Sequence, residues 1–76
     1  MSVEQRDRVA ETHRRTIHAL HDALAALESL LSVERGIAAR DPENAEASED
    51  IAHAEREIEA TKARIARLEG LMGQYS

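Results

Sequence analysis

The chain has 76 residues, of which 33% are charged and 42% hydrophobic, and its formal net charge is −5. This acidic balance argues against binding to duplex nucleic acid, because duplex binders release counterions through a basic face. The chain has no cysteine, phenylalanine or tryptophan, which excludes disulfide cross-links and leaves aliphatic residues to form the core. Such a composition is typical of a helical bundle, and the length predicts a single domain over residues 1–76.

The first predicted helix covers about residues 3–39 and begins at a capping box formed by Ser2 and Gln5. Its strongest apolar stripe has alternating steps of three and four residues, which is the spacing of a helix that packs along a partner helix. The members of this first stripe are Ile17, Leu20, Leu24, Leu27 and Leu31. Near the end of the helix, Gly36 permits two interpretations: it stops the helix in a Schellman motif, or the helix continues through it.

A second stripe lies beside the first, one residue earlier, and recurs every seven residues. Its members are Val9, Thr16, Ala23, Leu30 and Ile37. The first helix therefore has a broader apolar face than a two-stranded coiled coil needs, which favours a bundle with further neighbours. The alternative is that small residues such as Thr16 and Ala23 tolerate exposure to solvent.

The second predicted helix covers about residues 42–72, after a turn at about 40–41. Asp41 is expected to cap it, Pro42 suits its first position, and Glu43 complements the helix dipole. Because the connection is short, we expect the two helices to be antiparallel neighbours. The apolar stripe of this helix contains Ala47, Ile51, Ala54, Ile58, Thr61, Ile65, Leu68 and Met72.

The expected fold class is all-α: an antiparallel two-helix hairpin that dimerises into a four-helix bundle. Folding the chain at Asp41 places Ile51 near Leu31, and Ile58 near Leu24 and Leu27. Ordering the chain costs roughly 1.5 kcal/mol of conformational entropy per residue. An elongated pair of helices buries only a single apolar strip, which is too little to offset this cost. We therefore expect a second copy or another protein to complete the core.

Charges divide between the two ends of the expected hairpin. The open end carries Arg6, Arg8, Arg14 and Arg15, whereas residues 41–50 contain acids and no base. The acids considered as contacts are Glu43, Glu46, Glu49 and Asp50, together with Asp41. One interpretation is a solvated helix start with local ion pairs such as Glu11 with Arg15. The other is that these charges orient two antiparallel hairpins. A further alternative gives the arginines or the acids a nucleic-acid-related partner.

Four histidines raise the alternative of a metal-binding bundle. His18 and His21 are spaced three residues apart, and so are Asp50 and His53, whose spacing is similar to the carboxylate-x-x-His element of di-iron bundles. Such a site also needs inward glutamates on facing helices, and Glu34 is the one acid in line with the first stripe. We therefore expect solvated histidines and no cofactor.

Catalysis has no support, since the chain lacks a cysteine nucleophile and a glycine-rich phosphate loop. No apolar run is long enough for a bilayer, and Arg6 to Arg8 interrupt any early signal sequence, so a cytoplasmic location is expected. The expected function is a non-enzymatic protein–protein interaction module, such as an adaptor, co-chaperone or inhibitor subunit. The expected interface residues are Val9, Ile17, Leu20, Leu24, Leu27, Leu30, Leu31, Ile37, Ile51, Ile58, Ile65 and Leu68.

Overall fold

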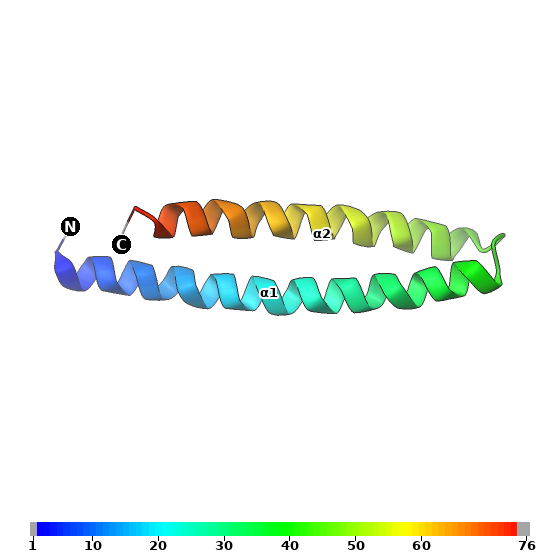
Figure 1. Cartoon of the computed structure of the whole chain (residues 1–76), viewed down its shortest axis with the longest axis horizontal. Coiled ribbons are helices and arrows are strands. Elements are labelled where there is room, and N and C mark those ends of the chain that lie inside the picture. Colours follow the sequence, from blue (N-terminus) through cyan, green and yellow to red (C-terminus); the bar gives the residue numbers. More distant parts are fainter. Residues whose placement is uncertain (1, 75–76) are drawn as a thin grey trace.

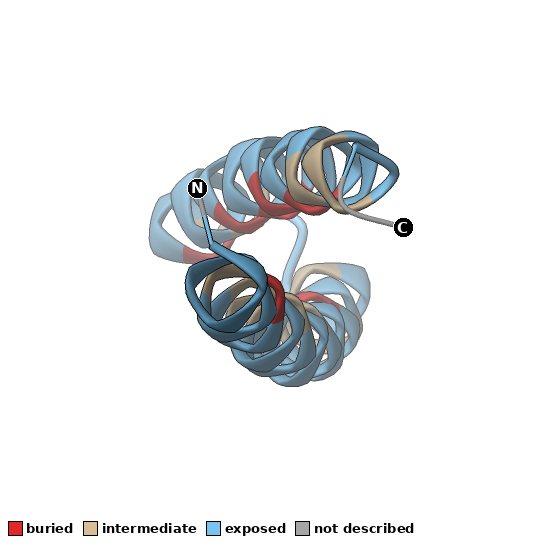
Figure 2. Cartoon of the chain, turned by 90° about the vertical axis from the view of Figure 1, so that its left-hand side faces the viewer, coloured by how far each residue is buried: buried red, intermediate tan, exposed pale blue. Residues whose placement is uncertain are grey.

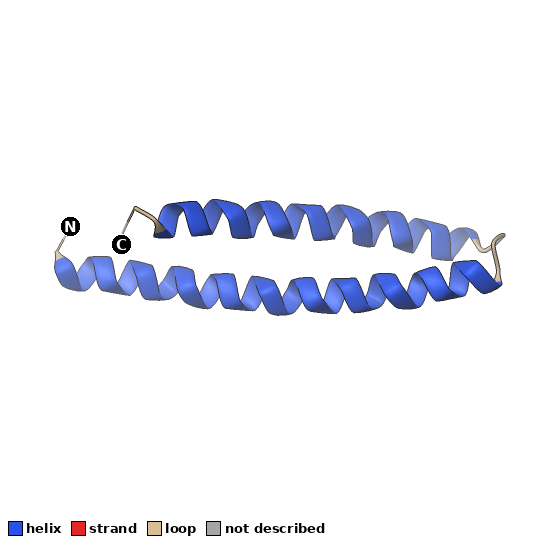
Figure 3. Ribbon diagram, viewed as in Figure 1, coloured by secondary structure: helices blue, strands red, loops and turns tan. Residues whose placement is uncertain are grey.

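The computed structural model describes residues 2–74, which form two α-helices and no strand. Helix α1 spans Val3–Arg40 and helix α2 spans Ala45–Met72, and the two lie side by side and antiparallel (Figure 1, Figure 3). The molecule measures 58 × 14 × 14 Å and has a radius of gyration of 17.3 Å. A globular chain of this length has a radius of gyration of about 11 Å. The expected all-α antiparallel hairpin is confirmed, and it is a rod.

Helix α1 begins at the predicted capping box. The backbone N–H of Ser2 donates to Oε1 of Gln5 at 3.0 Å, and the N–H of Gln5 donates to Oγ of Ser2 at 3.1 Å. The helix continues through Gly36 to Arg40. Gly36 does not adopt the positive φ that a Schellman motif needs. A helix stop at Gly36 is therefore wrong, and the interpretation in which the helix continues through this glycine is correct.

Helix α2 begins later than predicted, because Asn44 rather than Asp41 caps it. Oδ1 of Asn44 accepts the backbone N–H of Ala47 at 3.0 Å. Residues 42–43 therefore lie in the turn and not in the first turn of the helix. Asp41 belongs to the preceding helix, since its N–H closes the last turn of α1 by donating to the Ile37 carbonyl at 2.9 Å. Aspartate and asparagine suit a cap equally well, so local preference alone did not decide between them.

The core is a single strip between the helices, as the red segments that face each other in Figure 2 show. Its buried members are Ala10, Leu31, Ala47, Ala54, Ile58, Thr61 and Ile65. Ala54 is completely buried, whereas no large side chain among the described residues is. The helices therefore approach most closely at small residues, and the larger apolar side chains pack around these points.

The longer turn also moves the contacts of Leu31 along α2. Leu31 is buried with Ala54 and Ile58, and Ile51, its predicted partner, packs against the edge of this cluster. Leu24 and Leu27 pack against the same cluster, as expected for partners of Ile58. The two predicted stripes are thus the surfaces that face each other, and the added turn residues shift their alignment.

Replacing the cap residue tests the start of α2. Asn44→Ala is expected to lower the free energy of unfolding by about 0.5–2 kcal/mol, because the N–H of Ala47 loses its acceptor. Asp41→Ala is the matched control, because Asp41 contributes backbone groups to the turn. Thermal unfolding followed by circular dichroism measures both variants. An equal loss of stability in the two would contradict the assignment of Asn44 as the cap.

Overpacking the strip tests the close approach at Ala54. Ala54→Leu is expected to destabilise the protein by about 1–3 kcal/mol, because the added methyl groups meet a filled space. Ala52→Leu, on the exposed side of the same helix, should change stability little. Chemical denaturation of both variants provides the comparison. Stability unaltered in Ala54→Leu would show that the helices do not meet there.

Candidate interaction surface

Two of the three large apolar side chains that remain exposed in the described residues, Leu30 and Val33, share one face of α1. The large hydrophobic residues that remain exposed in residues 2–74 are Val3, Leu30 and Val33, at 69%, 46% and 59% of their full exposure. Leu30 belongs to the predicted second stripe, and Thr12, Ala19, Ala26 and Val33 join its members into a continuous stripe with steps of three and four residues. We call it the outer stripe, and its members are Val9, Thr12, Thr16, Ala19, Ala23, Ala26, Leu30, Val33 and Ile37.

The outer stripe is turned by about 100° from the stripe that faces α2, since consecutive helical residues differ by that angle. Leu31 is therefore only 8% exposed, whereas its neighbour Leu30 is 46% exposed. The middle of the outer stripe, at Ala19, Ala23 and Ala26, is exposed to solvent. Because α2 covers a single stripe, six of the nine members of the outer stripe are exposed, and Val9, Thr16 and Ile37 are half-buried.

Helix α2 has no counterpart to the outer stripe. Its apolar residues larger than alanine are all buried or half-buried: Ile51, Ile58, Ile65, Leu68, Leu71 and Met72. On its other sides, charged residues alternate with alanines such as Ala52 and Ala63. Within the described residues, α1 therefore has two apolar faces, one toward α2 and one at the outer stripe, whereas α2 has one apolar face.

The predicted interface residues fall into two groups. One group packs between α1 and α2, where all members are buried or half-buried: Ile17, Leu20, Leu24, Leu27, Leu31, Ile51, Ile58, Ile65 and Leu68. The other group, Val9, Leu30 and Ile37, belongs to the outer stripe. Val33 is not among the predicted residues, although it follows Leu30 by three positions and precedes Ile37 by four. That spacing is the signal that identifies it.

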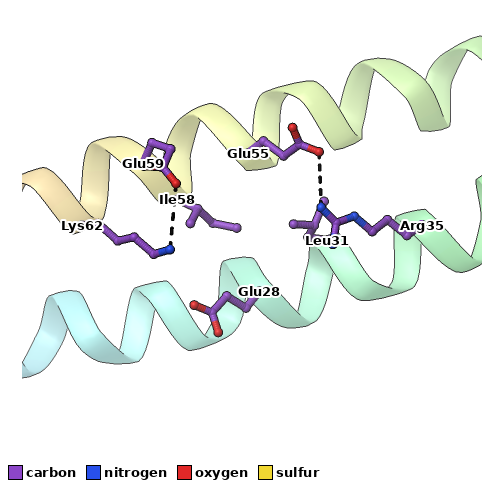
Figure 4. Close-up of a pocket in the computed structure, with 7 residues that line it drawn as sticks. All are labelled: Glu28, Leu31, Arg35, Glu55, Ile58, Glu59 and Lys62. Carbon is purple, nitrogen blue, oxygen red and sulfur yellow. Dashed lines mark hydrogen bonds and ion pairs between the residues drawn. The ribbon is translucent and has the colours of Figure 1, made fainter.

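A shallow groove beside the core strip is lined by charged side chains of both helices (Figure 4). Its lining residues are Glu28, Leu31, Arg35, Glu55, Ile58, Glu59 and Lys62. Nη2 of Arg35 lies 3.5 Å from Oε1 of Glu55, and Nζ of Lys62 lies 3.9 Å from Oε1 of Glu59. Exposed ion pairs of this kind contribute little to stability. The groove is open and lined mostly by charged side chains, so it does not resemble the enclosed apolar pockets that bind small molecules.

The residues of the alternative metal site lie apart. His18 is exposed, and its Nε2 lies 3.7 Å from Oδ2 of Asp22. Asp50 lies near the turn, in a hollow that Glu34 also lines, and Glu34 is about 20 Å along the axis of α1 from His21. No three His, Asp or Glu side chains of residues 2–74 are grouped to hold a metal ion. The hairpin by itself therefore does not assemble His18, His21, Asp50 and His53 into one site.

The four predicted arginines lie toward the open end of the rod, and the predicted acids of residues 41–50 lie at its turn end (Figure 1). At the open end, Nη2 of Arg14 lies 3.2 Å and Nε of Arg15 lies 3.1 Å from the Glu11 carboxylate. The local ion pair predicted for Glu11 and Arg15 is therefore confirmed. The remaining charged residues of the prediction are all exposed to solvent: Arg6, Arg8, Glu43, Glu46, Glu49 and Asp50.

Hydrogen bonds from the guanidinium groups of Arg14 and Arg15 lower the pKa of the Glu11 carboxyl below its usual value. A carboxyl with a lowered pKa in the folded state stabilises the fold above the pKa of the unfolded chain. Its contribution is lost as the pH falls through the folded-state pKa. Glu11 is fully exposed, so this effect is local to the open end.

Comparisons with protein-family models, with curated proteins and with solved structures find no match to this chain. Neither described helix is long and apolar enough to cross a membrane.

Removing the partners of Glu11 tests the local electrostatics. The double variant Arg14→Gln and Arg15→Gln is expected to raise the pKa of Glu11, because the carboxylate loses two charged donors. An NMR pH titration of the Glu11 side chain measures the change. Arg8→Gln is the control and should leave the Glu11 titration in place. The same Glu11 pKa in the wild type and the double variant would show that these ion pairs do not persist in solution.

Proposed function

We propose that this chain is a non-enzymatic helical module that works by protein–protein association, with the outer stripe of α1 as its binding surface and a second copy as its partner. The observation that carries the proposal is the position of Leu30 and Val33. Both are large, apolar and exposed, and both lie on one stripe of one helix. Contiguous exposed apolar surface that is rimmed by polar residues is typical of interaction sites.

The surface area of the chain supports a partner. The chain exposes 5561 Å², whereas a globular monomer of its mass exposes about 4,600 Å². The excess is about 950 Å², and a stable interface of standard size removes about 800 Å² from each partner. An additional neighbour along the rod therefore brings the exposed area close to that of an ordinary folded protein.

The angle between the two apolar faces of α1 supports a bundle. They differ by about 100°, which is close to the right angle between two neighbours of one helix in a four-helix bundle. Leu20 and Leu27 are half-buried and lie between the two faces. Two hairpins that share the outer stripe would enclose these leucines and complete a four-helix bundle.

A charge on the outer stripe tests the proposal. We expect the wild type to be a dimer and Leu30→Asp to dissociate it, weakening the dimer at least about 100-fold. Each dimer would lose two buried leucines, each worth about 1.5–3 kcal/mol. Light scattering after size exclusion measures the mass. It needs refractive-index detection, because Tyr75 is the single aromatic residue.

The matched control is Ser32→Asp, which places the same charge on the exposed polar side of α1. It should leave the dimer intact. Circular dichroism of Leu30→Asp should still show helix, since Leu30 does not belong to the core cluster. A wild-type protein that remains a monomer at high concentration would contradict self-association. So would a Leu30→Asp variant that dimerises as tightly as the control.

A further inference from the structure

We infer that two copies pack antiparallel through α1 against α1, with their two-fold axis between Ala23 and Ala26. The inference rests on the proposed self-association and adds the helix that makes the contact, its orientation and its register. It is carried by the sizes of the residues along the outer stripe and by the charges at the two ends of the rod.

We place α1 against α1 because α1 is the helix that has a second apolar face, which the hairpin leaves mostly exposed. Helix α1 has two apolar faces and α2 has one, which already packs against α1 within the chain. A second copy that laid its α2 on the outer stripe would cover Leu30 and Val33 with a charged helix face. The apolar surface of α1 is matched only by the same surface on another copy, as in the isologous contacts of two-fold dimers.

The sizes of the residues set the register. If Ala23 lies beside Ala26 of the second copy, each large residue in the second half of the outer stripe lies opposite a smaller one, while Val9 lies opposite Arg40. Leu30 then faces Ala19, Val33 faces Thr16, and Ile37 faces Thr12. Alternation of large and small residues across facing positions is how packed helices fill the space between them. Because the pair is symmetric, each of these contacts occurs twice.

The length of the outer stripe allows this contact to extend along most of the rod. From Val9 to Ile37 the stripe covers about 42 Å of helix, and the molecule is 58 Å long. The exposed alanines at its middle, Ala19, Ala23 and Ala26, present no bulk that would keep two helices apart. The centre of the dimer is therefore a close approach, with the larger side chains on either side of it.

The charges at the ends of the rod match in the same register. The start of α1, which carries Arg6 and Arg8, lies beside the end of α1 of the second copy, where the acidic turn begins at Asp41. A parallel pair would instead place the arginines of both copies together and the acidic turns of both copies together. It would also set Leu30 against Leu30. Like charges in contact disfavour that arrangement.

Shifting the antiparallel pair by one heptad is less favourable, because both shifts move Arg6 and Arg8 away from the acidic turn of the second copy and one of them sets Val33 against Val9. In one direction Asp22 meets Asp22 of the second copy across the flank of the helix pair. In the other direction Leu20 meets Glu34, and the overlap of the two outer stripes becomes shorter. Charge and size therefore select one register among the three that keep the stripe in contact.

Engineered disulfides test the register directly, because the chain has no cysteine of its own. The test protein is the full chain with Thr16→Cys and Val33→Cys. Its two thiols are about 25 Å apart along α1, too far for a disulfide within one chain, which needs Cα atoms within about 7 Å. Oxidation is expected to give a covalent dimer in which position 16 of each copy is linked to position 33 of the other.

Peptide mapping after cleavage at Glu28, which separates the two positions, identifies the linked peptides. The matched control combines Thr16→Cys with Ser32→Cys and moves one thiol to the polar side of α1. This control should remain uncrosslinked under the same conditions. Circular dichroism before oxidation checks that both variants are helical.

The outcomes separate the register from the proposed function. Links of position 16 to position 16 and of position 33 to position 33 would show a parallel pair and overturn the inference, while self-association would stand. A dimer by light scattering that forms no disulfide would also overturn it, since another face would make the contact. A monomer under all conditions would overturn both the inference and the proposed function.

Discussion

The structure depends on the packing of one apolar strip between two helices, centred on Leu31, Ala54 and Ile58. No side chain from any third element reinforces this strip in the described chain, and the one cross-helix ion pair, Arg35 with Glu55, is exposed. Two helices that share a single strip leave most of each cylinder in water. Every other property of the molecule, including its 58 Å length and its large exposed area, follows from this arrangement.

The described hairpin presents most of its polar side chains on open surfaces. Its groove is open, its histidines are spread over separate turns, and its acids are solvated. What it offers a partner is a long, straight surface with a defined sequence of large and small residues. Leu30 and Val33 give that surface its apolar area, and the alanines between Thr16 and Leu30 give it room for a close neighbour. Such a surface recognises a second helix when large side chains of one helix lie opposite small side chains of the other.

The proposed self-association would be physically connected to the division of charge in this molecule. The acids at the turn and the arginines at the open end lie at opposite ends of one rod. An antiparallel pair brings unlike ends together, and a parallel pair brings like ends together. The charges thus act on orientation, whereas the outer stripe provides the buried area. This separation of roles is the usual one, since exposed charges contribute little to affinity and much to the choice of partner.

The sequence by itself determined both helices, the Ser2–Gln5 capping box, and the two stripes that face each other, because these depend on hydrogen bonds within one turn and on helical periodicity. It did not determine where α2 begins, since Asp41 and Asn44 are equally good caps and the end of α1 decides between them. Nor did it reveal that Val33 is exposed. Periodicity describes every stripe of a helix alike, and only the position of α2 decides which of two neighbouring stripes is covered and which remains free for a partner.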